Sequence, residues 1–114
     1  MTTIPVDEGY AYDYLAILQV KSNNNVGDSQ SAYARCYDHL RDEIGHNLHL
    51  IICHSQEYFD LVEANQRTFD CVERARYGSI TAKEVDDSNM ERYNMKVRLQ
   101  NKYFPKSKVL EKKS

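Results

Sequence analysis

The chain has 114 residues, which is the length of one ordinary domain. It contains three Phe and no Trp, so nine Tyr must supply most of the aromatic bulk of the core. No apolar run approaches the ~20 residues that a membrane-spanning helix needs, and residues 1–5 lack the basic and apolar regions of a signal peptide. These features argue against a membrane span and predict a cytoplasmic location.

The net charge of −2 hides an uneven distribution. Residues 1–101 carry 10 basic and 16 acidic side chains, whereas residues 102–114 carry five Lys and one Glu. We therefore predict a basic C-terminal tail over residues 105–114, attached to an acidic body. Such a tail either keeps the terminus solvated or attracts an anionic partner, while the acidic body argues against nucleic acid as that partner.

Two helices are predicted in the first 45 residues. Acidic residues open the first helix, whose apolar positions continue to Lys21. Residues 22–27 read as a loop, because Asn and Gly tolerate left-handed backbone conformations. The second helix starts at residue 28 or 29 and stops at Gly45. Its apolar stripe consists of Tyr33, Cys36, Tyr37, Leu40 and Ile44.

Residues 46–104 are predicted to form two long helices that fold back on each other at Tyr77-Gly78-Ser79. In the first of them, residues that suit a coiled-coil seam recur at alternating intervals of three and four. They are Leu48, Ile51, Ser55, Tyr58, Val62, Asn65, Phe69, Val72 and Arg76. The matching seam of the second helix consists of Val85, Ser88, Arg92, Met95 and Leu99.

One register satisfies both seams. Antiparallel partners about a fixed turn have residue numbers of constant sum, and pairing Val72 with Val85 places Tyr58 opposite Leu99 at the same sum, 157. The predicted fold is therefore all-α, with four helices in one bundle domain over residues 1–104. A long antiparallel, coiled-coil-like hairpin over residues 46–104 dominates it.

This register also places a polar layer in the middle of the apolar seam. Asn65 lies opposite Arg92, and Asn89 lies one helical turn away. A buried Arg needs carboxylate or amide oxygens around its donors. Asp70 and Glu73 on the preceding helix are predicted to be supporting carboxylates.

The polar layer has two interpretations. Polar seam residues fix the register and the antiparallel pairing of coiled coils, which is a purely structural role. Alternatively, Arg92 and Lys96, one turn apart, form a notch that binds a phosphate or a carboxylate, with Asn65 and Asn89 beside them. Both interpretations stay open at the level of sequence.

Other kinds of site are weakly supported. Histidines and cysteines crowd one region, namely Cys36, His39, His46, His49, Cys53 and His54. These residues lie on both sides of the helix boundary predicted at Gly45, so they are not expected to converge on one zinc ion. The region contains one ExxH motif, whereas a di-iron bundle needs two. No metal or cofactor is therefore predicted. The chain also has no GxSxG, HExxH or Gly-rich phosphate loop, and we do not expect an enzyme.

Several short motifs follow one another in a characteristic order. Residues 13–21 match an opening like IDKLTILEIK, and residues 109–114 match an ending like VEEKSY. The motifs of the last two predicted helices contain Asn65, Phe69, Asp70, Glu73, Arg76, Asn89, Arg92 and Lys96. In this order the chain resembles a family of short helical bacterial proteins found among lipopolysaccharide and surface-glycan genes. The resemblance implies a helical fold and a link to glycan assembly.

Together these patterns predict a non-enzymatic helical interaction or accessory module. Its partner would be another protein or a second copy of the chain, which would give a homodimer. One alternative is a protein of glycan metabolism that binds or modifies an anionic sugar derivative through the predicted notch. A second alternative is a small viral protein that interacts with a host protein, suggested by size, acidity and richness in Asn and Tyr.

Overall fold

The computed structural model describes residues 8–78 and 81–105 of the chain. These residues form helices and no strands, which confirms the predicted all-α class for the described part. The helices are α1 (Glu8–Asn23), α2 (Ser29–Ile44), α3 (His46–Cys53), α4 (Gln56–Arg76) and α5 (Ala82–Tyr103). None of them is both long enough and apolar enough to cross a membrane. Most of the predicted basic tail, residues 106–114, lies outside the described residues.

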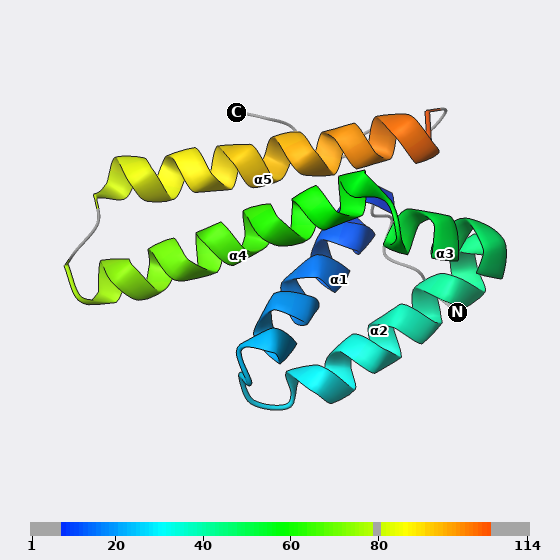
Figure 1. Ribbon diagram of the computed structural model, residues 1–114, viewed down its shortest axis with the longest axis horizontal. Coiled ribbons are helices and arrows are strands. Elements are labelled where there is room, and N and C mark those ends of the chain that lie inside the picture. The colour runs from blue at the N-terminus through cyan, green and yellow to red at the C-terminus, as the bar shows by residue number, and fades with distance from the viewer. Residues whose placement is uncertain (1–7, 79–80, 106–114) are drawn as a thin grey trace, which may run out of the picture.

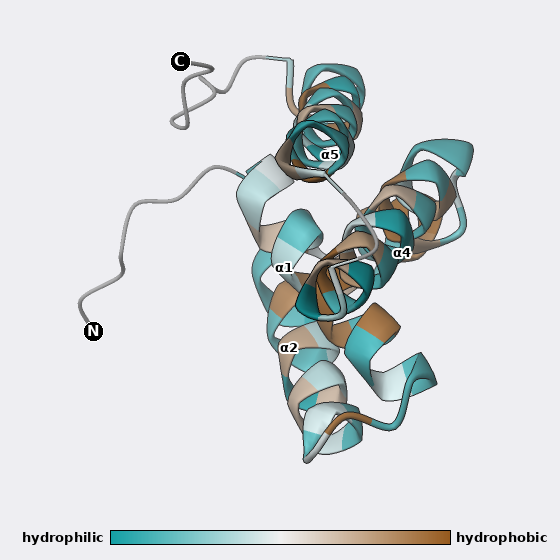
Figure 2. Ribbon diagram, turned by 90° about the vertical axis from the view of Figure 1, so that its left-hand side faces the viewer, coloured by the Kyte–Doolittle hydropathy of each residue, from teal (hydrophilic) through white to brown (hydrophobic). Residues whose placement is uncertain are grey.

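The helices are arranged around α1. Figure 1 shows α4 and α5 side by side in opposite directions, with α1 leaving them at an angle and α2 returning beside α1. The short α3 connects α2 to the beginning of α4. In the perpendicular view of Figure 2, α1 and α2 extend from one side of the α4–α5 pair. Because α1 packs against α2, α4 and α5, it joins the two helix pairs into one unit.

The prediction of four helices is wrong, because the long helix expected over residues 46–76 is interrupted. Ser55 has an extended backbone (φ −85°, ψ 157°) and divides the segment into α3 and α4. Its hydroxyl donates to the carbonyl of Ile52 (2.6 Å) and accepts from the backbone N–H of Tyr58 (3.1 Å). A serine that caps a helix in this way competes with continued helix, which explains the break.

The remaining boundaries follow local chemistry. Gly45 ends α2 as predicted, and its φ of +105° is a conformation that L side chains rarely adopt. Thr81 begins α5, and its hydroxyl accepts from the backbone N–H of Glu84 at 3.3 Å. The last helix ends at Tyr103, two residues before Pro105, which lacks the N–H needed to continue it.

The contacts between α4 and α5 define how the two helices are aligned. Arg98 donates to Asp60 at 2.6 Å, and the hydroxyl of Thr68 donates to the backbone carbonyl of Ser88 at 3.4 Å. The residue numbers of these pairs add to 158 and 156, compared with 157 in the predicted register, while the pair of Lys102 with Glu57 adds to 159. The side-chain contacts therefore scatter around the predicted sum, and the exact register stays a prediction.

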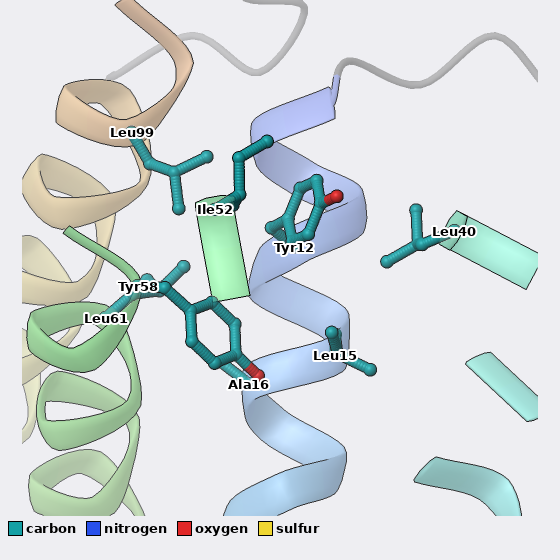
Figure 3. Close-up of a cluster of buried hydrophobic side chains, with 8 residues drawn as sticks. All are labelled: Tyr12, Leu15, Ala16, Leu40, Ile52, Tyr58, Leu61 and Leu99. Atoms are coloured by element: carbon teal, nitrogen blue, oxygen red, sulfur yellow. The ribbon is translucent and has the colours of Figure 1, made fainter. Parts of the chain in front are cut away.

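The core lies where α1 meets the other helices. Figure 3 shows its buried side chains, which come from all five helices: Tyr12, Leu15, Ala16, Leu40, Ile52, Tyr58, Leu61 and Leu99. Both buried tyrosines find a polar partner. The hydroxyl of Tyr12 lies 2.8 Å from His49 Nδ1, and that of Tyr58 donates to Gln19 Oε1 at 2.8 Å. Tyrosine thus supplies aromatic bulk to the core without leaving an unpaired hydroxyl.

Candidate anion-binding site

A buried carboxylate on α1 connects the polar residues of α4 and α5. Asp13 Oδ1 accepts from Asn65 Nδ2 at 2.9 Å, and Asp13 Oδ2 lies 3.7 Å from Arg92 Nε. Asn65 also donates to the carbonyl of Leu61 at 3.0 Å. Asp13 is 6% exposed and Asn65 4% exposed, so this layer is part of the protein interior. The polar layer therefore joins three helices.

The carboxylates predicted to support Arg92 have other partners. Asp70 is exposed and accepts from Gln66 at 3.0 Å. Glu73 forms an ion pair with Arg76 at 3.5 Å, one turn along the same helix. The carboxylate that meets Arg92 is instead Asp13. Asp13 belongs to the motif of residues 13–21, but the register of the predicted hairpin involves only residues 46–104 and does not place α1.

A groove of about 700 Å³ lies between the second half of α1, the loop after it, α4 and Arg92 of α5. Part of its lining is apolar, with Ile17 and Val20 from α1 and Phe69 and Val72 from α4. Its polar lining consists of Lys21, Asn24, Asn65, Thr68, Glu73, Arg76 and Arg92. The groove thus combines apolar surface with polar side chains from three helices.

The groove carries a positive balance of charge. Three of its lining residues, Lys21, Arg76 and Arg92, are cationic, and Glu73 is the one carboxylate among them. Lys21 and Arg76 lie in the last turns of α1 and α4, where cations also offset the negative end of the helix dipole. Part of the positive charge is therefore explained by helix stability, while Arg92, in the middle of α5, has no such role.

A smaller hollow of about 260 Å³ shares Arg92 with the groove. Its lining consists of Asp13, Asn89, Arg92, Tyr93 and Lys96. The structure thus brings together three of the predicted notch residues, Asn89, Arg92 and Lys96, around one hollow. The fourth, Asn65, lines the groove instead.

The predicted region of histidines and cysteines contains a buried cluster. His49 is fully buried, its Nδ1 lies 2.8 Å from the Tyr12 hydroxyl, and Cys53 Sγ lies 3.6 Å from its Nε2. Burial lowers the pKa of His49, and the positive charges of Arg41 and His46 lower it further. Burial also raises the pKa of Cys53 to about 11, so its thiol stays protonated at neutral pH. Over residues 8–78 and 81–105, no three His, Cys, Asp or Glu side chains are grouped to hold a metal ion.

The described fold and cavities define the protein as a small all-α chain with two cation-lined cavities that meet at Arg92. Comparison with protein-family models, curated proteins and solved structures found no match.

Proposed function

We propose that the protein is a non-enzymatic helical binding module that holds a small organic anion in the groove between α1, α4 and α5. The ligand class is a phosphorylated or otherwise anionic sugar derivative. The observation that carries the proposal is the combination of apolar lining residues with three cationic side chains in one cavity. The sequence contains none of the common catalytic motifs, which favours binding over catalysis.

The size and lining of the groove suit such a ligand. Its volume of about 700 Å³ falls within the range of roughly 300–1,000 Å³ typical of small-molecule sites, which are mostly apolar with a few placed polar groups. Phe69 and Val72 lie one helical turn apart on α4 and offer an apolar surface for the face of a sugar ring or a base.

Arg76 is an accessible cation of the groove, since its side chain is 69% exposed. A guanidinium can donate two parallel hydrogen bonds to a phosphate or a carboxylate, which a lysine ammonium cannot do in the same geometry. The ion pair of Arg76 with Glu73 is long, at 3.5 Å, and exposed. Such a pair contributes little to stability, so an anionic ligand can displace Glu73 from Arg76 at low cost.

The assignment to sugar derivatives draws on the resemblance to proteins of surface-glycan gene clusters. Five residues from the motifs of the last two predicted helices line the groove: Asn65, Phe69, Glu73 and Arg76 from α4, and Arg92 from α5. Membership of that family remains a proposal, and it narrows the ligand from organic anions in general to sugar phosphates and nucleotide sugars.

The experiment that tests the proposal is a thermal-shift screen followed by calorimetric titration. The compounds are sugar phosphates, nucleotide sugars and the unphosphorylated parent sugars, and the proteins are the wild type, Arg76→Gln and Arg74→Gln. Arg74 is a matched control because it is also an exposed arginine in the last turn of α4 but does not line the groove.

We expect an anionic compound to stabilise the wild type, and Arg76→Gln to weaken its binding about tenfold, as loss of a charge-assisted hydrogen bond does. Arg74→Gln should bind like the wild type. Stabilisation by no compound, or an equal loss in both variants, would contradict the proposed groove site.

A protein partner or a second copy of the chain is the competing proposal, and the observation that favours it is exposed apolar surface. The large hydrophobic residues exposed in the described part are Tyr10, Tyr14, Val26, Ile51, Phe59, Val72, Tyr77 and Met90. Pairing of two α4–α5 hairpins would give the predicted homodimer. Sedimentation equilibrium distinguishes the cases, since a monomer at high micromolar concentration excludes that dimer.

A further inference from the structure

The smaller hollow beside Arg92 has features of a site in its own right. We infer that it binds a single phosphate group, held between the ammonium of Lys96 and the guanidinium of Arg92. This inference does not rest on the proposed function of the groove, because apart from Arg92 the two cavities are lined by different residues.

The first observation is the burial of Lys96, which is 3% exposed. Lysine is rarely so buried, because removing its charge from water is costly without compensating interactions. Its Nζ lies 5.7 Å from the ring centroid of Tyr10 and 5.1 Å from that of Tyr93. The negative faces of aromatic rings attract a cation at such distances. The two tyrosine rings therefore contribute to the stabilisation of the Lys96 side chain beside the hollow.

The second observation is the charge of the lining. Arg92 and Lys96 contribute two positive charges, and Asp13 contributes one negative charge. The lining therefore has a formal charge of +1. Binding of an anion would neutralise this charge, whereas binding of a cation would increase it.

The third observation is the size of the hollow and the donors at its edge. A cavity of about 260 Å³ is smaller than the roughly 300–1,000 Å³ of ordinary small-molecule sites, but it exceeds the volume of several waters at about 30 Å³ each. It fits one phosphate group better than a whole nucleotide sugar. Asn89 is exposed at its edge, where its amide can donate to an oxyanion, and Tyr93 lines it with a phenol.

The test is an NMR titration of the ¹⁵N-labelled full chain with inorganic phosphate, at constant ionic strength maintained with chloride. Lys96→Met removes the ammonium but keeps an apolar stem of similar length. Lys83→Met is the matched control, because Lys83 is an exposed lysine on the same helix, paired with Asp87 at 2.9 Å. Asn89→Ala provides a second test that does not depend on a buried substitution, since Asn89 is exposed.

In the wild type, the amide signals of residues around the hollow should shift and saturate. Lys96→Met should weaken phosphate binding about tenfold or more, Asn89→Ala should weaken it by a smaller factor, and Lys83→Met should leave it unchanged. Shifts that do not saturate, or binding unchanged in both Lys96→Met and Asn89→Ala, would overturn the assignment.

Two further comparisons identify the source of the phosphate and separate the hollow from the groove. Tighter binding of inorganic phosphate than of a sugar monophosphate indicates a site for the free ion, and the reverse order indicates the end of a larger ligand. Arg76→Gln, which alters the groove, should leave phosphate binding at the hollow unchanged. A loss of phosphate binding in Arg76→Gln would place the anion in the groove and refute the second site.

Discussion

Replacement of Asp13 by Ala tests whether the polar layer stabilises the fold. The substitution removes the acceptor of Asn65 Nδ2 and the partner of Arg92. Breaking a buried ion pair from one side usually costs about 3–5 kcal/mol. Here the side chain of Arg92 is 32% exposed and Asn65 retains Leu61 as an acceptor, so water and backbone compensate part of the loss. We therefore expect Asp13→Ala to lower the free energy of unfolding by about 2–3 kcal/mol.

The measurement is urea unfolding followed by circular dichroism, with Glu91→Ala as the matched control. Glu91 also pairs with an arginine, Arg67, across the α4–α5 interface, but both side chains are more than 40% exposed. An exposed pair of this kind contributes at most about 1 kcal/mol. If Asp13→Ala and Glu91→Ala lower the stability equally, the polar layer does not stabilise the fold and the structural role assigned to Asp13 is wrong.

Two more predictions concern α1 and α3. A Cβ at Gly9 would lie 3.0 Å from Gln100 Oε1 and 3.1 Å from the backbone oxygen of Lys96. Because this space is too tight, Gly9→Ala should lower the free energy of unfolding, measured in thermal melts, by about 1–3 kcal/mol. An unchanged melting temperature would contradict the close packing of α1 on α5. Because the pKa of His49 is lower in the folded protein than the roughly 6.5 of an unfolded chain, stability should be fully present above about pH 6.5 and fall as pH decreases toward the folded pKa. In urea melts, the free energy of unfolding of His49→Gln should decrease less between pH 7.5 and pH 5.5 than that of the wild type. An identical decrease in both proteins would refute the role of His49 in this pH dependence.

The helices were largely predictable because their signals are local. Gly45 and Thr81 mark helix ends by backbone preference and hydroxyl capping, and each acts at the position where the structure has it. The prediction that Ser55 is a seam position inside a continuous helix is wrong, because a serine fits the three–four spacing of a seam and is also a good N-cap. Sequence periodicity alone cannot decide between these roles, since the outcome depends on how α3 packs against its neighbours.

The candidate site was predictable only in part, because Asp13 comes from α1, whereas the other residues of the polar layer come from the α4–α5 pair. Asn89, Arg92 and Lys96 share a helix, so their spacing alone brings them together around the hollow. Asp13 reaches the same place only because α1 crosses the α4–α5 pair, a contact between residues far apart in the chain. Seam periodicity carries no information about such a crossing. A carboxylate among the apolar and aromatic residues 10–18 is nevertheless a signal, because a buried charge requires a partner.

Arg92 links the stability of the fold to the chemistry of both cavities. It pairs with Asp13 inside the polar layer, and it lines the groove and the hollow. A substitution at Arg92 would therefore lower the stability of the fold and weaken anion binding at the same time. Such a variant could not distinguish the pairing of Arg92 with Asp13 from a direct contact of Arg92 with the ligand. Arg76 and Asn89 separate these roles, because each lines one cavity and both side chains are exposed. Loss of binding in a variant at either position, with the fold retained, would distinguish a ligand site from a polar layer that only fixes the packing of the helices.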